Sequence, residues 1–235
     1  MSTITCIFGK VGSMEKVVTM EEAVSRIRDG QSVMVGGFMT VGTPEGIVDA
    51  LLESPAKDLI LICNDTGFAD KGVGKLVACD KVRKVIASHI GTNRETGNKM
   101  HACEIEVELV PQGTLAEQIR SAGAGLGGFL TPTGVGTVAA ENKETMTFDG
   151  KTYLLERPLK ADVALLKAYK ADRSGNLVYR RSARNFNPLM AMAAELVIVE
   201  ADHIVELGEL DPDEVMTPCI FVDLIVQKEG PRESA

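Results

Sequence analysis

The chain has 235 residues, 45% of them hydrophobic and 25% charged, which is typical of a soluble globular protein and is long enough for one α/β domain. A formal net charge of −8 argues against a nucleic-acid surface, because such domains are usually basic, and favours small-molecule chemistry. No apolar run approaches the roughly 20 residues that span a bilayer, and the first residues lack the order of a secretory signal, so we expect a cytoplasmic protein with no membrane association.

The first element expected is a helix after an N-terminal extension. Residues 1–18 show little periodicity, and Met14 could be an alternative initiator, so whether residues 1–13 are native is left open. Thr19 and Glu22 match a capping box at the start of a helix. The domain is expected to cover residues 19–228 without an internal repeat or linker, and to be followed by a polar tail, 229–235.

A buried strand followed by a glycine-rich loop comes next. Residues 33–35 are a short continuous apolar run, as in a parallel sheet, and Gly36 and Gly37 end it. Thr43 is a suitable N-cap and Pro44 a suitable first residue for a following helix. Because glycines lack Cβ atoms, a ligand could lie on this loop, and free helix amides favour a negative or carbonyl group. A tight strand-to-helix turn without any ligand remains the alternative.

Further strands are predicted at residues 59–63, 82–87 and 107–110. Residues 64–67 follow the first of them, where polar side chains of α/β proteins meet ligands. Asp65 is therefore a candidate acid, base or nucleophile, although an Asx turn is the favoured interpretation.

After a break at residues 111–113, residues 115–119 are expected to form a short helix. Gly123, Gly125 and Gly128 match G-x-G-x-x-G, but a helix precedes them instead of a strand, so a dinucleotide site is rejected. Residues 123–136 are interpreted as a long loop that a ligand could approach closely.

The C-terminal half predicts a hairpin and two more strands. The expected elements are a hairpin of 146–148 and 153–155 around Asp149-Gly150, a strand at 161–167, a turn at 172–176, a polar loop at 182–188, a Met-rich helix at 189–194 and a strand at 196–199. Together the elements predict an α/β fold with an open, mostly parallel sheet flanked by helices.

No metal site or disulfide framework is expected. The five cysteines are scattered and never form C-x-x-C. The three histidines, His89, His101 and His203, lie far apart without metal-ligand spacing.

The order of residues 29–44 resembles the signature of the family I coenzyme A transferases. Every specified place of that signature is filled, by Asp29, Gly30, Val33, Met34, Val35, Gly36, Gly37, Phe38, Gly42 and Pro44. The resemblance extends from about Met20 to about Gln227, through segments 64–67, 86–93, 111–115, 123–137 and 182–188. These segments look like the α subunit of bacterial acetate or butyrate–acetoacetate CoA-transferases.

The resemblance implies a fold of the CoA-transferase α-subunit type and an active site shared with a β subunit, in a heterotetramer or larger assembly. Family members use ping-pong chemistry, in which a glutamate of a Ser-Glu-Asn-Gly motif carries the acyl group and then CoA. That motif is absent from these 235 residues, so the chain alone is expected to be inactive. CoA is then a substrate, and no cofactor is expected.

By the same resemblance, Gln112 is the expected oxyanion donor. The expected substrate- and CoA-binding residues are Gly36, Gly37, Phe38, Met39, Thr40, Val41 and Gly42, with Gly123, Gly125, Gly127 and Gly128 in the wall around the acyl and carboxylate site. Arg184 is treated as a solvated or structural arginine that could instead pair with a carboxylate.

Several functions remain open at this point. Acetoacetate with acetate or butyrate is the closest substrate pair, but the corresponding half of a succinyl-CoA:3-oxoacid CoA-transferase is an alternative, and an aromatic or branched 3-oxoacid is not excluded. A stand-alone nucleotide- or phosphate-binding protein, or a DeoR-like sugar-phosphate sensor, would also use glycine-rich loops on a doubly wound core.

Overall fold

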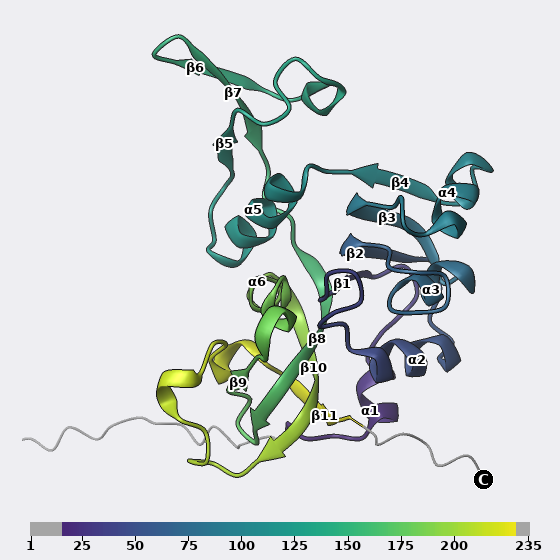
Figure 1. The fold of residues 1–235 in the computed structure, drawn as a ribbon, viewed down its shortest axis with the longest axis vertical. Helices are drawn as coiled ribbons and strands as arrows, with labels where there is room; N and C mark the ends of the chain where they lie inside the picture. The colour runs from purple at the N-terminus through teal and green to yellow at the C-terminus, as the bar shows by residue number, and fades with distance from the viewer. Residues whose placement is uncertain (1–15, 229–235) are drawn as a thin grey trace, which may run out of the picture.

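The computed structural model describes residues 16–228. The expected extension with Met14 lies mostly, and the polar tail entirely, outside these residues. The chain forms one large sheet with helices on both faces and a small second sheet that projects from one end (Figure 1).

The large sheet confirms the predicted open, mostly parallel arrangement. Its strands lie in the order β11 (Leu224–Gln227), β10 (Ala194–Val205), β8 (Ala161–Asp172), β1 (Ser32–Val35), β2 (Leu59–Asp65), β3 (Val82–His89) and β4 (Glu106–Leu109). All neighbours on this path are parallel, and the short β9 (Leu177–Val178) pairs antiparallel with β8. The carboxyl ends of β1, β2 and β3 therefore meet at one edge, where α/β proteins bind ligands.

Two hydrophobic clusters pack on the two faces of this sheet. Val33 and Val35 of β1 point into the cluster beneath α1 (Met20–Val24), α2 (Glu45–Glu53) and α3 (Gly74–Ala78). Met34 points into the opposite cluster, with α5 (Gln112–Gly123) and α6 (Asn187–Ala191). A strand buried on both faces explains the continuous apolar run in the sequence. In Figure 1, α1, α2, α3 and α4 (Arg94–His101) lie on one side and α5 and α6 on the other.

Several predicted boundaries are wrong, although the elements exist. Strands β8 and β10 have 12 residues each, well beyond the predicted 161–167 and 196–199. Their second halves carry polar side chains, but the two strands pair continuously from Ala161 to Asp172, so tertiary pairing outweighs local sequence. Helix α6 begins at Asn187, with Pro188 in its first turn, and ends at Ala191. The capping box of α1 is confirmed.

The projecting sheet corrects the interpretation of residues 123–136 as one loop. It has the order β5 (Phe129–Thr131), β7 (Lys151–Glu156) and β6 (Thr145–Phe148), all antiparallel. The hairpin of β6 and β7 is confirmed, and Asp149 and Gly150 adopt the left-handed conformation at its turn, with φ of 48° and 74°. The described part of the chain also has four short 3₁₀ helices: η1 (Val138–Ala140), η2 (Arg181–Arg184), η3 (Pro212–Glu214) and η4 (Cys219–Phe221).

Two further observations concern residues 16–228. Cys63 is buried, whereas Cys79 and Cys103 are exposed, and these cysteines and Cys219 are all free thiols. None of the helices in this range has the length and apolarity needed to cross a bilayer.

Gly97 offers a test of the fold's stability. It lies inside α4, and no atom lies within 4 Å of the position that a Cβ would take. Gly97→Ala is expected to raise the free energy of unfolding by roughly 0.5–1 kcal/mol, because alanine loses less backbone entropy in a helix. The midpoint of thermal unfolding should rise by about 1–4 °C.

The contrasting variant is Gly175→Ala, because Gly175 has a φ of 103° and a Cβ there would meet Val222 at 3.0 Å. This variant should unfold at a lower temperature than the wild type. A Gly97→Ala protein that is no more stable than the wild type would contradict the account of α4.

Candidate active site at the carboxyl ends of β1 and β2

The glycine-rich loop after β1 is a tight hairpin turn. Phe38 and Val41 exchange two backbone hydrogen bonds of 3.0 Å. Met39 and Thr40 between them have φ of 48° and 68°, in the left-handed region that non-glycine residues rarely adopt. Each such residue costs on the order of 1 kcal/mol, and backbone strain of this kind collects at functional sites. Phe38 and Val41 are exposed, so the outer surface of the loop faces solvent.

Two asparagines of the polar loop before α6 clasp this turn. Asn185 accepts from the Gly37 amide at 3.2 Å and donates to the Val41 carbonyl at 2.9 Å. Asn187 donates to the Gly42 carbonyl at 3.0 Å. Gly36 is required for this arrangement, because a Cβ there would lie 1.9 Å from Asn187 Oδ1. The sequence marked this loop as unusually polar but did not indicate its contact with the glycines.

The start of α2 differs from the prediction. The N-cap is Pro44 and not Thr43, and it makes no side-chain capping bond. Thr43 is buried against the turn, where a Cβ on Gly37 would lie 2.2 Å from its Oγ1. The Ile47 amide donates instead to the buried carboxylate of Glu200 at 3.0 Å. That amide is therefore not available to a ligand, contrary to the expectation of free amides at this helix.

Asp65 at the end of β2 collects three hydrogen bonds. One carboxylate oxygen accepts from the Gly67 amide at 2.9 Å, as in an Asx turn. The other accepts from the Met39 amide and from Asn64 Nδ2, both at 2.8 Å. Asp65 is 6% exposed and Asn64 2% exposed. The structure thus supports the turn interpretation of Asp65 and adds a link to the glycine-rich loop.

Gln112 is the first residue of α5 and is exposed. Its Nε2 donates to Asn64 Oδ1 at 2.8 Å. Since Asn64 is bonded to Asp65 and Asp65 to Met39, the structure brings Gln112 and the loop of residues 36–42 into one network. A side-chain amide nitrogen carries two N–H groups, so Gln112 keeps a donor for a ligand.

The second glycine group lies away from Gln112 within this chain. Gly123 is the last residue of α5, about 16 Å along the helix axis from Gln112. A Cβ on Gly123 would lie 2.6 Å from Met192 Cβ, and one on Gly128 would lie 2.6 Å from the Glu156 carbonyl, so packing explains these two glycines. No atom lies within 4 Å of a Cβ on Gly125 or Gly127.

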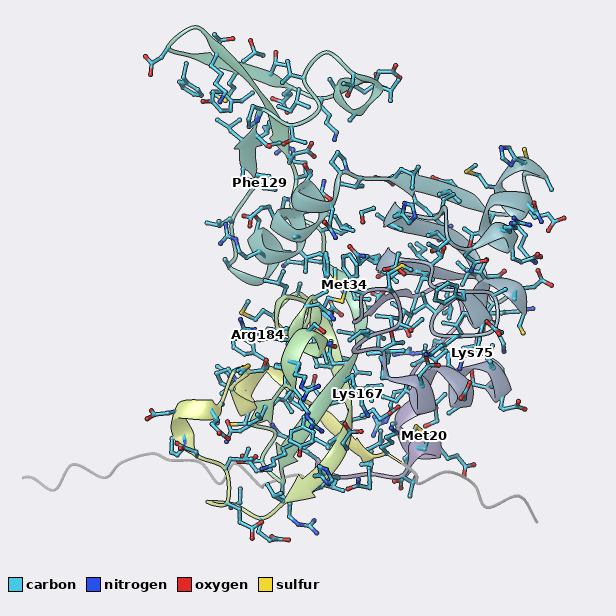
Figure 2. All side chains as sticks on the ribbon, viewed as in Figure 1. Met20, Met34, Lys75, Phe129, Lys167 and Arg184 are labelled. Atoms are coloured by element: carbon cyan, nitrogen blue, oxygen red, sulfur yellow. The ribbon has the colours of Figure 1, made fainter. Side chains whose placement is uncertain are left out.

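Arg184 lies outside this network. Within residues 16–228, no hydrogen bond or ion pair joins its side chain to either glycine group, and its Nη1 lies 3.7 Å from Met216 Sδ. The residue is exposed. Figure 2 shows Arg184 on the side of the sheet that carries α6, opposite Lys75 of α3.

A second hairpin loop repeats the first, so the expectation of no internal repeat is wrong at this scale. Gly67, Phe68 and Gly72 follow β2 as Gly37, Phe38 and Gly42 follow β1, and Phe68 bridges Lys71 as Phe38 bridges Val41. The Thr40 methyl packs between the loops, 3.0 Å from a Cβ placed on Gly72. Only glycines and one phenylalanine are shared, which is too little to show as a repeat in the sequence.

Cys63 lies beneath the loop but is unsuited to nucleophilic chemistry. It lines a cavity of about 10 Å³ together with Gly36, Gly37, Thr40 and Asp65, which leaves room for about one water molecule. Burial, reinforced by the Asp65 carboxylate, raises the pKa of the Cys63 thiol far above its ordinary value. The thiol therefore stays protonated, and a substrate has to lie on the outer surface of the loop.

Comparison with known proteins gives a consistent family assignment. Residues 17–228 match the family model described as "Coenzyme A transferase". The chain is 60% identical to the alpha subunit of the acetate CoA-transferase of Escherichia coli K12, over 92% of this chain and 98% of that protein. It is 50% identical to one subunit of a probable succinyl-CoA:3-ketoacid coenzyme A transferase of Bacillus subtilis, over 93% and 90%. It is 46% identical to the acetoacetyl-CoA:acetate/butyrate CoA transferase alpha subunit of Clostridium acetobutylicum, over 91% and 98%.

The fold is shared with a solved structure of an acyl-CoA transferase, YdiF, from E. coli O157:H7. The TM-score is 0.79 at 20% identity, and the match covers 91% of this chain and 47% of that chain. The chain thus spans about half the length of that protein. The expected fold and the expected family resemblance are both confirmed.

Proposed function

Since this chain belongs to the coenzyme A transferase family, we propose that it is the α subunit of a heteromeric CoA-transferase. The enzyme moves CoA between acetoacetyl-CoA, or another short-chain acyl-CoA, and a short-chain carboxylate such as acetate or butyrate. The names of the relatives from E. coli and C. acetobutylicum support this substrate class.

The observation that carries the proposal is the network of Gln112, Asn64, Asp65 and the glycine-rich loop. Attack on an acyl carbonyl creates an oxyanion, and an aimed amide donor stabilises it by about 3 kcal/mol or more in related chemistry. Gln112 presents its amide nitrogen beside a turn whose outer surface is open. The loop of residues 36–42 binds the acyl-CoA, and Gly123, Gly125, Gly127 and Gly128 form the more distant wall toward the partner.

The nucleophile is a glutamate of the β subunit. The chain contains no Ser-Glu-Asn-Gly motif, and both carboxylate oxygens of Asp65 accept hydrogen bonds from inside the fold. Two such half-site chains form a heterotetramer or a larger assembly. The reaction needs no resident cofactor or metal, because the CoA thioester is itself a substrate. The scattered cysteines fit the cytoplasm as its location.

One alternative substrate is supported by a specific observation. The 50% identity to the probable succinyl-CoA:3-ketoacid relative exceeds the identity to the acetoacetyl-CoA:acetate/butyrate relative, so succinyl-CoA has to be included as a donor in any assay. The 60% identity to the acetate relative makes acetate the first acceptor to be tried.

The experiment is a CoA-transfer assay with three samples: this chain alone, its β partner alone and the two mixed. Acetoacetyl-CoA and succinyl-CoA serve as donors, with acetate, butyrate and acetoacetate as acceptors. Activity is expected only in the mixture, and the preferred pair names the enzyme. Transfer by this chain alone would contradict the half-site proposal, and an assembled mixture without any transfer would contradict the transferase assignment.

A further inference from the structure

We propose that Asp65 is a positioning residue that fixes both the orientation of the Gln112 side chain and the conformation of the Met39–Thr40 turn. The inference deepens the proposed function and rests on it for its kinetic consequence. Its structural consequence can be measured without any turnover.

The first step concerns the direction of the amide groups. An ionised carboxylate can only accept hydrogen bonds, so Asn64 has to turn its Nδ2 toward Asp65 and its Oδ1 away from it. Asn64 Oδ1 is then an acceptor, and Gln112 has to present Nε2 to it. Ser88 Oγ, 3.1 Å away, also donates to Asn64 Oδ1 and reinforces this direction. Reversing either amide would set two donors or two acceptors against each other.

The consequence for catalysis is that Gln112 faces the site as a donor. If its Oε1 pointed to Asn64 instead, the residue would present the wrong group at the position where an oxyanion develops. The charge of Asp65, two side chains away and 6% exposed, thus decides which group of Gln112 is held next to Asn64.

The second step concerns the turn. The Met39 amide donates to the same Asp65 oxygen that holds Asn64, at 2.8 Å. Met39 and Thr40 both have positive φ, so this conformation persists only because surrounding contacts hold it. Asp65 supplies the contact at the centre of the strain.

The second hairpin serves as an internal reference. Phe68 and Lys71 exchange the same two backbone hydrogen bonds, at 3.3 and 3.2 Å, yet neither Ala69 nor Asp70 is among the described residues with positive φ. The strained turn therefore occurs in the loop that is bonded to Asp65 and not in its copy. Asp70 is exposed on this second loop and supplies a control with the same change of charge.

The experiment compares three variants of the assembled heteromer. Asp65→Asn places an NH₂ group where three donors converge, and should lower kcat by about tenfold or more and speed hydrogen exchange of residues 36–42. Asn64→Ala cuts the link to Gln112 while Asp65 still holds Met39. It should lower kcat with the KM for acyl-CoA within about twofold and leave the exchange of residues 36–42 unchanged. Asp70→Asn should change neither property.

Glycine at the strained position tests the mechanism by rescue. Met39→Gly removes the cost of positive φ, so in the Asp65→Asn background it should restore the slow exchange of residues 36–42. Wild-type exchange and wild-type kcat in an assembled Asp65→Asn enzyme would overturn the proposal. If that variant does not assemble, Asn64→Ala decides, because an unchanged kcat there would remove the link to Gln112. Exchange on the chain by itself separates a failure of this inference from a failure of the transferase assignment.

Discussion

Replacing Gln112 with alanine is expected to lower kcat of the assembled enzyme by about 100- to 1,000-fold, because one aimed donor to an oxyanion contributes a factor of this size. The KM for acyl-CoA should change much less, since the interaction strengthens only in the transition state. Steady-state kinetics with acetoacetyl-CoA and acetate would measure both parameters. The loss should occur without a comparable loss of stability, because Gln112 is exposed and contributes a single hydrogen bond, to Asn64.

Two further variants separate the donor from the side chain's shape. Gln112→Glu keeps the shape, removes the donors and adds a negative charge next to the developing oxyanion, so its kcat should fall at least as far as that of Gln112→Ala. Glu117→Ala lies on the same helix and removes only a half-exposed ion pair with Arg120, so its kcat should stay within about twofold of the wild type. Wild-type turnover by Gln112→Ala paired with its partner would exclude the residue as the oxyanion donor.

The parts of this site that the sequence predicted are those set by local chemistry. The strand around Met34, the turn at Gly36 and Gly37 and the Asx turn at Asp65 all depend on residues within a few positions of one another. Such features follow from burial on both strand faces and from backbone conformations that glycine and aspartate favour. The position of Gln112 came from a family resemblance, and the structure places it beside the same sheet edge.

The connections between those parts were not predictable in this way. Asp65 reaches Met39, and Asn187 reaches Gly42, across long stretches of chain, and nothing in the sequence says that these elements meet. Thr43 shows the opposite error, because its local pattern favours an N-cap, but tertiary packing turns it against Gly37. Once the hydroxyl is buried there, the amides of α2 need another acceptor, and Glu200 of β10 supplies it.

Glu200→Ala is expected to produce the largest loss of stability among single changes to the charged side chains of residues 16–228. Glu200 is 1% exposed and lies 2.9 Å from Lys167 Nζ, which Figure 2 places in the centre of the molecule. Removing one partner of a buried ion pair costs about 3–5 kcal/mol, because the other charge stays buried. Asp202 still contacts Lys167 at 2.8 Å, so we expect the lower end, about 3 kcal/mol.

The matched control is Glu144→Ala, which removes the same side chain from the ion pair with Arg157. That pair is shorter, at 2.6 Å, but its side chains are 69% and 68% exposed, so its loss should cost less than about 1 kcal/mol. Glu200→Gln keeps an acceptor for the Ile47 amide and should fall between the two. Urea unfolding of this chain gives all three values. Equal stabilities for Glu200→Ala and Glu144→Ala would mean that Asp202 alone satisfies Lys167, and that α2 does not need the carboxylate at its first turn.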